Sequence, residues 1–337
     1  MPATRRTATR PPPPLPSLDA KPTRSVVLWL DKADAYLRAA EAAGLTKRFS
    51  LEVAPLASEP PDDMLGRAEA LLAWRPPTHL GQRAPRLTWI QSLTGGIDQW
   101  LVADYPERAV LTCARGSHRL SMPEHILAAL FLVTKSLAPI VLDQRERQWT
   151  RRVNPTLAGR TLGILGLGAI GTELARKAAA LEMLVIGTKR DGRAVPHVAS
   201  VHRPAETDTV LARADYVVLL LPSTPETRGL INARSLKRMK RTAYLLNFGR
   251  GDLVVEDDLA AAVRSGVIAG AVLDVFVKEP LPPDSPLWTT EGITIFPHVG
   301  GLHPDRDDTV AALWVDNLRR FADGEPLREV VDRTRGY

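Results

Sequence analysis

Residues 161–180, TLGILGLGAIGTELARKAAA, decide the fold of this chain. The first part, TLGILGL, is apolar enough for a strand buried on both faces of a sheet, and the stretch from TELARK onward continues as a helix. At their junction, Gly166, Gly168 and Gly171 form the pattern G-x-G-x-x-G. In this setting the first glycine permits a tight turn, the second lets the backbone approach a pyrophosphate, and the third lets the helix pack closely on the strand. We therefore predict a dinucleotide site here; the alternative is a glycine-rich turn that serves packing alone.

Six further apolar runs have the same character and mostly alternate with helical stretches. The seven predicted strands are 25–30, 87–93, 161–167, 184–188, 216–221, 243–248 and 269–276. In addition, Ser121 with Pro123 and Glu124 predicts a capping box that opens one long helix reaching Gln148. The alternation predicts an α/β fold with doubly wound parallel sheets.

The strand predicted at 184–188 ends in two cations, Lys189 and Arg190. About 20 residues after such a glycine motif, an Asp or Glu commonly accepts hydrogen bonds from the ribose 2′-OH of NAD. Lys189 lies 18 residues after Gly171, so cations stand in that place and could pair with a 2′-phosphate. We predict NADP as the preferred cofactor and NAD as a second one that the site could use. The alternative is a solvated loop in which Asp191 neutralises part of the charge.

Three polar side chains follow later apolar runs: Arg250 in NFGRG, Glu279 in DVFVKEP and His298 in PHVGG. The carboxyl ends of parallel strands face one crevice, so we expect these groups to converge there. Taken singly, each would more often be a surface or structural residue. Their arrival from successive strand ends favours a substrate site.

The ordered motifs GLGAIG, LPSTPETRGLI, NFGRG, DVFVKEP and PHVGG resemble those of the D-isomer-specific 2-hydroxyacid dehydrogenases. The resemblance runs from about residue 25 to residue 330 and is nearest to the glyoxylate/hydroxypyruvate reductases, to which SLTGGIDQW at 92–100 and the TKR stretch are similar. It implies a catalytic set of Arg250, Glu279 and His298, and a substrate carboxylate held by Arg250 and the backbone of Gly95 and Gly96. The implied and predicted cofactor-binding residues are Gly166, Gly168, Ala169, Ile170, Gly171, Lys189, Arg190, Leu221, Pro222, Thr227, Phe248, Gly249, Asp274, His298 and Gly300. Phe296 departs from the family, which commonly has a threonine before the Pro-His pair, and this leaves the packing beside the nicotinamide open.

The chemistry of 2-oxo acid reduction gives each implied catalytic residue a task. A hydride moves to C2 while the carbonyl oxygen gains a proton, so the site needs an acid near that oxygen and a cation for the carboxylate. His298 suits the first task, with the Glu279 carboxylate stabilising the imidazolium, and the planar guanidinium of Arg250 suits the second. The sequence thus predicts NADPH-dependent reduction of a small 2-oxo acid of the glyoxylate or hydroxypyruvate type to the D-2-hydroxy acid. Two alternatives stay open: a cofactor-sensing, corepressor-like scaffold, and a formate-type dehydrogenase, whose reaction gives no proton to the substrate.

The resemblance also implies a chain that folds into two domains. Residues 121–298 would form the Rossmann domain that binds NAD(P). Residues 25–120 and 299–337 would form a flavodoxin-like substrate domain built from both ends of the chain. The long helix from Met122 would aid formation of a homodimer.

Composition excludes several classes of partner. The formal charge is +6, but +4 of it falls in residues 1–24, a Pro- and Arg-rich stretch predicted to be a disordered tail, so we predict no nucleic-acid partner. The longest apolar run, 126–133, is far too short for a membrane span, and we predict no membrane partner and a cytoplasmic location, with a transit peptide as a minor alternative. Cys113 is the single cysteine, which excludes an intramolecular disulfide and a Cys-based metal cluster; no metal is predicted.

Overall fold

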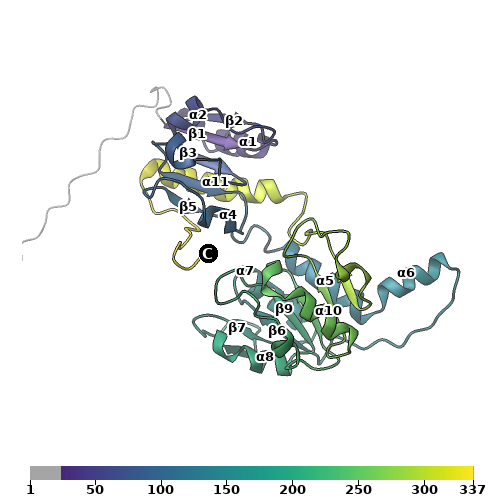
Figure 1. The fold of residues 1–337 in the computed structure, drawn as a ribbon. Coiled ribbons are helices and arrows are strands. Elements are labelled where there is room, and N and C mark those ends of the chain that lie inside the picture. Colours follow the sequence, from purple (N-terminus) through teal and green to yellow (C-terminus); the bar gives the residue numbers. More distant parts are fainter. Residues whose placement is uncertain (1–23, 337) are drawn as a thin grey trace, which may run out of the picture. The chain divides into compact units, whose positions relative to one another are not determined.

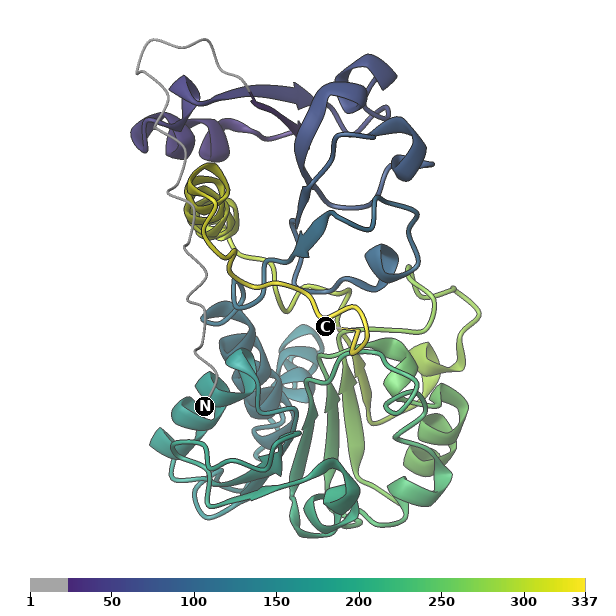
Figure 2. The same cartoon turned by 90° about the vertical axis from the view of Figure 1, so that its left-hand side faces the viewer.

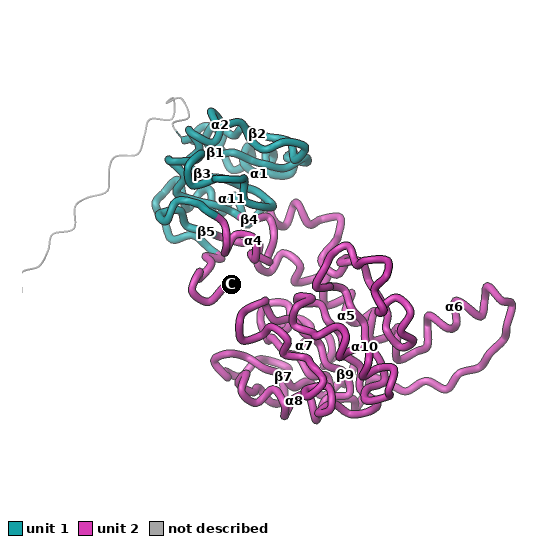
Figure 3. The backbone as a smooth tube through the Cα atoms, in the orientation of Figure 1, with its two compact units in different colours: residues 1–91, 104–111, 311–328 teal, residues 92–103, 112–310, 329–337 magenta. Residues whose placement is uncertain are grey.

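A computed structural model describes residues 24–336, which fall into two compact units (Figure 3). Of the described residues, the first unit holds 24–91, Asp104–Leu111 and Ala311–Arg328, and the second holds Ser92–Ala103, Thr112–Val310 and 329–336. The tail predicted at 1–24 lies outside the described residues except for Arg24, which opens the first strand. The domain boundaries inferred from the sequence stay a prediction, because these units are defined by contacts and not by function.

The first unit is built on a five-stranded sheet in the order β2-β1-β3-β4-β5 (Figure 1). This is the flavodoxin-like order, and β1 pairs in parallel with both of its neighbours. The strands are β1 (Arg24–Trp29), β2 (Phe49–Ala54), β3 (Ala68–Ala73), β4 (Trp89–Ser92) and β5 (Val110–Thr112). The helices that accompany them are α1 (Asp34–Ala42), η1 (Leu45–Lys47), α2 (Asp62–Arg67), α3 (Leu80–Arg83) and most of α11 (Arg306–Asp323).

Helix α11 brings the C-terminal part of the chain into this unit. Its Trp314 ring packs edge-on against Tyr36 of α1 at 5.9 Å, and its Phe321 lies 5.3 Å from Trp89 of β4. Tyr36, Trp89 and Trp314 are fully buried, so these contacts belong to the core of the unit. The unit is therefore built from both ends of the chain.

The second unit is built on a seven-stranded sheet in the order β12-β11-β10-β9-β6-β7-β8, and all six pairs are parallel. The strand order reverses between β6 and β9, which is the topological switch point of a Rossmann fold. The strands are β6 (Thr161–Leu165), β7 (Leu184–Thr188), β8 (Ser200–His202), β9 (Tyr216–Leu219), β10 (Tyr244–Asn247), β11 (Gly270–Leu273) and β12 (Ile293–Ile295). The helices are α4 (Asp98–Leu101), α5 (Ser121–Thr134), α6 (Leu137–Arg145), α7 (Ala169–Ala180), η2 (Pro204–Glu206), α8 (Thr207–Arg213), α9 (Ala233–Leu236), η3 (Gly251–Leu253), α10 (Glu256–Arg264) and η4 (Pro286–Thr289).

Both faces of this sheet are buried, as Figure 2 shows by the helices on either side of its strands. Along β9, Val217 and Leu219 pack with residues of α8 and α10, whereas Tyr216 and Val218 pack with residues of α5 and α7. Alternate side chains thus enter opposite cores, which explains why the strand is apolar throughout. The predicted fold class, two doubly wound parallel-sheet domains, is confirmed.

The structure adds strands that the sequence did not predict. All seven predicted runs contain a strand, but β2, β3, β5, β8 and β12 were missed. Three of these strands, β5, β8 and β12, are only three residues long, and β3 reads AEALLA, a composition that suits a helix equally well.

The long helix predicted through Gln148 is wrong, because the structure breaks it after Thr134. Pro139 lacks an N–H to donate to the carbonyl of Lys135, and that carbonyl instead accepts from Asn154 Nδ2 at 3.2 Å. The backbone turns at Ser136, whose φ is +52°, and α6 leaves at 64° to α5. No single helix among residues 24–336 is long and apolar enough to cross a membrane; α5 and α6 together meet that test only as this bent pair.

The predicted capping box at the start of α5 is also wrong. The helix begins with Leu120 as its N-cap, so Ser121 already lies in the first turn, and its buried Oγ has no hydrogen-bond partner. Glu124 accepts a hydrogen bond from Lys177 Nζ of α7 at 2.6 Å instead.

Candidate active site

The glycine-rich turn after β6 has the geometry of a phosphate cradle. Gly166 has a φ of +110°, and a Cβ there would lie 2.8 Å from the carbonyl oxygen of Leu220. A Cβ at Gly171 would lie 2.3 Å from the Gly166 carbonyl oxygen, so α7 approaches the turn too closely for a side chain. Gly168, the N-cap of α7, has nothing within 4 Å of its Cβ position. The backbone N–H groups that begin α7, at Ala169 and Ile170, therefore border open space that suits a pyrophosphate.

Lys189 stands beside this turn. Its backbone N–H donates to the His202 carbonyl of β8 at 2.9 Å, and its Nζ donates to the Leu167 carbonyl within the glycine-rich turn at 3.2 Å. Arg190 follows and is exposed. Gly192 closes the turn: its φ is +66°, and its N–H donates to the Lys189 carbonyl at 3.1 Å. The ammonium of Lys189 thus borders the glycine-rich turn, near which the sequence predicts a 2′-phosphate of the cofactor ribose.

Arg203 joins these cations although sequence reasoning missed it. It directly follows β8, whose carboxyl end lies beside that of β7, and its Nε lies 3.4 Å from the Cβ position of Gly192. The signal was present in the chain as a basic residue after a strand, but the three-residue strand β8 had not been recognised. Cations from two adjacent strand ends therefore border one turn.

The loop after β9 forms another border of the cradle. The backbone of Leu221 approaches Gly166 closely, because a Cβ added to that glycine would lie 3.2 Å from the Leu221 nitrogen. Thr227 Oγ1 donates to the Pro222 carbonyl at 2.7 Å and accepts from the Thr224 N–H at 2.8 Å. The hydroxyl of Thr227 therefore holds the loop closed.

Asp274 fixes the segment that carries His298. It follows β11, is 1% exposed, and accepts the N–H groups of Val299 at 2.8 Å and of Gly300 at 3.0 Å. Burial raises the pKa of Asp274, and these two backbone donors oppose that shift. A Cβ at Gly300 would lie 2.8 Å from the carboxylate and 2.9 Å from the Phe248 ring, so only glycine fits there.

Phe296 fills space between two other aromatic rings. It lies 5.5 Å from the His125 ring of α5 and 6.3 Å from Phe248, in edge-to-face contact with both. The phenylalanine that departs from the family pattern is thus accommodated by aromatic packing.

Glu279 and His298 meet as the sequence argument expected. Oε2 of Glu279 lies 2.6 Å from Nδ1 of His298, and Oε1 accepts the N–H of Phe276 at 2.9 Å. His298 has a φ of +54°, and its side chain is 53% exposed. With Nδ1 held by the carboxylate, Nε2 is the ring atom left to exchange a proton with a substrate.

Arg250 lies directly against the loop that follows β4. A Cβ at Gly96 would lie only 1.7 Å from Nη2 of Arg250, so the absence of a side chain makes room for the guanidinium. Nη1 donates to the Gly249 carbonyl at 2.7 Å. Both segments belong to the second unit. Arg250 and the loop around Gly96, which the resemblance implies bind one substrate carboxylate, therefore lie together. Gly95 is different: a Cβ added there would lie 3.6 Å from the Ala114 carbonyl oxygen, an ordinary contact distance.

Asn247, which sequence reasoning missed, shapes the turn that presents Arg250. It ends β10, is 1% exposed, donates from Nδ2 to the Arg250 carbonyl at 2.8 Å, and accepts the Gly249 N–H at 3.1 Å. A polar residue that closes an apolar strand was the available signal.

Asp98 is a second missed residue at this site. Its Oδ2 accepts from Nε of Arg250 at 3.0 Å, across 152 positions of sequence. It was present in the quoted stretch SLTGGIDQW, but nothing local to that stretch indicated its partner.

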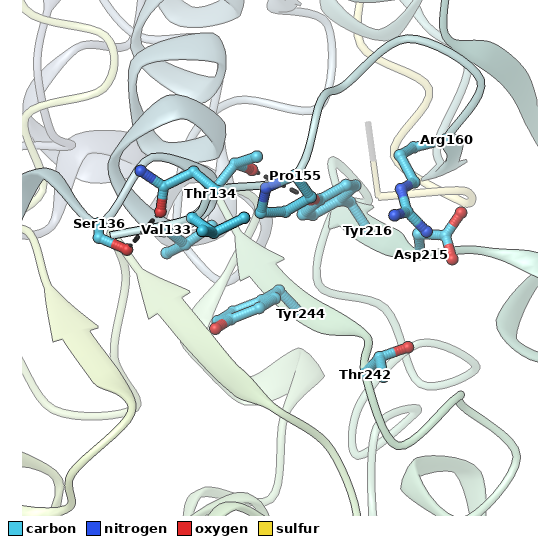
Figure 4. Close-up of a pocket in the computed structure, with 11 residues that line it drawn as sticks. Val133, Thr134, Ser136, Pro155, Arg160, Asp215, Tyr216, Thr242 and Tyr244 are labelled. Atoms are coloured by element: carbon cyan, nitrogen blue, oxygen red, sulfur yellow. Dashed lines mark hydrogen bonds between the residues drawn. The ribbon is translucent and has the colours of Figure 1, made fainter. Parts of the chain in front are cut away.

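A separate pocket of about 340 Å³ lies at the other end of the same strands (Figure 4). Tyr216 and Tyr244, the first residues of β9 and β10, line it with Thr134, whose hydroxyl bonds Tyr216 at 3.0 Å. None of the predicted site residues lines it. The candidate active site is instead the set of groups at the carboxyl ends of the strands.

Comparison with known proteins identifies the family. The family model "D-isomer specific 2-hydroxyacid dehydrogenase, NAD binding domain" matches residues 127–300. The chain is also 31% identical, over 279 residues, to glyoxylate/hydroxypyruvate reductase A of Photorhabdus laumondii, which covers 80% of this chain and 88% of that protein. The chain belongs to the D-isomer specific 2-hydroxyacid dehydrogenases.

Solved structures of this dehydrogenase family agree with the fold. An NADPH-dependent glyoxylate/hydroxypyruvate reductase from Sinorhizobium meliloti, in complex with NADP and sulfate, is 30% identical with a TM-score of 0.81, and the match covers 93% of this chain and all of that one. A D-isomer specific 2-hydroxyacid dehydrogenase from Xanthobacter autotrophicus, in complex with NADPH and MES, is 32% identical with a TM-score of 0.82, and the match covers 94% of this chain and all of that one. The protein is an NAD(P)-dependent oxidoreductase, as the sequence predicted.

Proposed function

We propose that this dehydrogenase uses NADPH to reduce a small 2-oxo acid, of the glyoxylate or hydroxypyruvate type, to the D-2-hydroxy acid. The observation that carries the proposal is the pairing of Glu279 with His298 at 2.6 Å in a site where Arg250 lies against Gly96. A loaded proton donor and a carboxylate anchor are the two groups that this reduction requires of the protein. A cofactor-sensing scaffold needs neither, and a formate-type reaction has no use for the donor.

The residues present fit a bound NADP. The open Cβ position of Gly168 marks space for a pyrophosphate at the start of α7, and Lys189, Arg190 and Arg203 place positive charge beside the adjoining turn. The cofactor-binding residues named from the sequence are retained in this proposal. When bound, NADPH supplies the hydride that reduces C2.

Each residue at the strand ends then has one task. The Nη groups of Arg250 and the N–H groups of Gly95 and Gly96 hold the substrate carboxylate. His298 donates the proton from Nε2 to the carbonyl oxygen while Glu279 keeps Nδ1 bound and the ring oriented. Asp274 holds the backbone after His298 in place through Val299 and Gly300.

We also propose that two copies of the chain form a homodimer through α6, in the cytoplasmic location expected from the sequence. No residue of α6 is buried, and Leu137, Ile140, Val141 and Leu142 are between 41% and 57% exposed. Apolar side chains gathered in this way indicate a protein interface. A second copy is the partner that the family resemblance implies.

The test is a turnover assay on the purified full chain. NADPH oxidation is followed with glyoxylate, hydroxypyruvate and larger 2-oxo acids, and the same panel is repeated with NADH. We expect the small acids with NADPH to give the highest kcat/KM. A protein that binds NADPH but oxidises it with none of these acids would contradict the proposed function.

A further inference from the structure

The candidate site holds an acidic side chain that the reduction does not use. Asp98 opens the short helix α4, and its Oδ2 lies 3.0 Å from Nε of Arg250 and 3.4 Å from the Cβ position of Gly96. Its side chain is 49% exposed, and Oδ1 makes no hydrogen bond within residues 24–336. A negative charge therefore borders the same glycine as the guanidinium.

The guanidinium of Arg250 is divided between three directions. Nε faces Asp98, Nη1 faces the Gly249 carbonyl, and Nη2 lies over Gly96. Within the described part of the chain these bonds use the N–H of Nε and one N–H of Nη1, which leaves Nη2 and the second N–H of Nη1 to take a substrate carboxylate. Asp98 offsets the charge of Arg250, so the pair carries no net charge and offers no further positive charge to a second carboxylate.

We propose that Asp98 determines specificity by charge: it admits 2-oxo acids with one carboxylate and disfavours those with a second. This inference rests on the proposed function, because it assumes that the substrate carboxylate binds at Arg250. A substrate bound to the Nη groups lies next to Asp98, because Oδ2 of Asp98 bonds Nε of the same guanidinium. A second carboxylate on such a small acid adds a like charge to that neighbourhood, and we expect the repulsion to change relative affinity about tenfold or more. Glyoxylate and hydroxypyruvate carry no such group.

Asp98 could instead only orient Arg250, and substrate ratios separate the two roles. A purely orienting residue affects every 2-oxo acid alike, whereas a charge filter acts on the ratio between a diacid and a monoacid. The probes are oxaloacetate and hydroxypyruvate, both measured with NADPH. Asp98→Asn keeps the size and an acceptor oxygen but removes the charge, and Asp98→Glu keeps the charge.

We expect Asp98→Asn to raise the oxaloacetate to hydroxypyruvate ratio of kcat/KM by about tenfold or more. Asp98→Glu should leave the ratio near that of the wild type. Asp257→Asn is the matched control, because it removes the same charge from an exposed position on α10 and should leave the ratio unchanged. Equal losses for both acids in Asp98→Asn, or an unchanged ratio, would overturn the filter while leaving the proposed function standing.

A second measurement keeps the two proposals distinguishable. If the wild type reduced none of the 2-oxo acids, the proposed function would fail, and the filter would then be judged by equilibrium binding to the NADPH-loaded protein. The ligands are oxamate, a monoanion, and oxalate, a dianion. Asp98→Asn must raise the binding affinity for oxalate, relative to that for oxamate, by about tenfold or more. An equal change in affinity for both ligands would overturn the filter.

Discussion

Gly95 and Gly96 are neighbours in sequence, but only Gly96 lies against Arg250, the proposed substrate anchor. A methyl group at residue 96 would meet Nη2 of Arg250 at 1.7 Å, whereas one at residue 95 would meet the Ala114 carbonyl at 3.6 Å. The end of an arginine side chain can move aside, so the protein with Ala at residue 96 should still fold. Its guanidinium, however, would be displaced from the loop.

We therefore expect Gly96→Ala to lower kcat/KM for glyoxylate by about a hundredfold, since displacements of about 1 Å in a positioned group have effects of this size. The affinity for NADPH should not change. Gly95→Ala is the matched control and should have a much smaller effect. Comparable losses in the two variants would contradict the contact between Arg250 and Gly96.

In the proposed reduction, the Glu279 carboxylate orients the His298 ring. Its Oε2 lies 2.6 Å from Nδ1, which leaves Nε2 as the ring atom that exchanges a proton with the substrate. Glu279→Gln removes the charge and keeps a hydrogen-bonding amide. The kcat/KM should then fall by about tenfold or more in both directions, because a charge-assisted hydrogen bond to Nδ1 is lost, while the affinity for NADPH should not change.

The measurement is kcat/KM in both directions for the wild type and Glu279→Gln. A solvent isotope effect shows whether proton transfer limits the rate, and His298→Ala, which should nearly abolish both directions while NADPH still binds, is the reference. A Glu279→Gln variant with the kcat/KM of the wild type, with proton transfer limiting, would remove Glu279 from this role.

At the scale of elements, we expect the carboxyl ends of β7 and β8 together to select the cofactor. Lys189 and Arg190 follow β7, and Arg203 follows β8 and packs on Gly192 of the same turn. Changing Lys189 and Arg190 to Asp and Ser should weaken NADPH binding by about a hundredfold and leave NADH binding equal or better, because a cation pair is lost and a 2′-OH acceptor gained. Arg203→Ala should produce a smaller loss, for NADPH alone.

Dissociation constants for both cofactors, measured by titration of the purified variants, check this prediction. Lys237→Ser, at an exposed lysine beyond α9, is the control for loss of charge. Equal losses of NADPH and NADH affinity would mean that the cations stabilise the turn and do not read the phosphate.

The sequence predicted those elements that carry a strong local signal. The strands of the second sheet next to the switch point are apolar on both faces, and the glycine pattern marks the turn at β6, so the fold class could be predicted. The ordered motifs let Arg250, Glu279 and His298 be proposed as the catalytic set. The break at Ser136 could not, because Pro139 also fits the interior of a predicted helix as a kink. Asp98 and Arg203 were missed because their partners lie on other elements, which only the folded chain brings near.

At the scale of the whole molecule, α6 is the part that a single chain does not explain. It extends from the second unit in Figure 1, and none of its residues is buried. The segment that follows it exposes Trp149 at 92% and Val153 at 103%. Water-exposed apolar groups on this scale would lower solubility unless another surface covered them. We therefore expect a second copy of the chain to bury them.

The variant Val141→Glu with Leu142→Glu places two negative charges in that interface. We expect the wild type to have the mass of a dimer in light scattering coupled to size exclusion, and the variant to have the mass of a monomer at the same concentration, because buried unpaired charges cost more than the contacts return. Gln144→Glu adds a charge to the exposed end of the same helix and should leave the dimer intact if the apolar residues carry the interface. Circular dichroism shows whether the monomeric variant keeps its fold. A wild-type monomer, or a variant that stayed dimeric, would contradict the assignment of α6 as the interface.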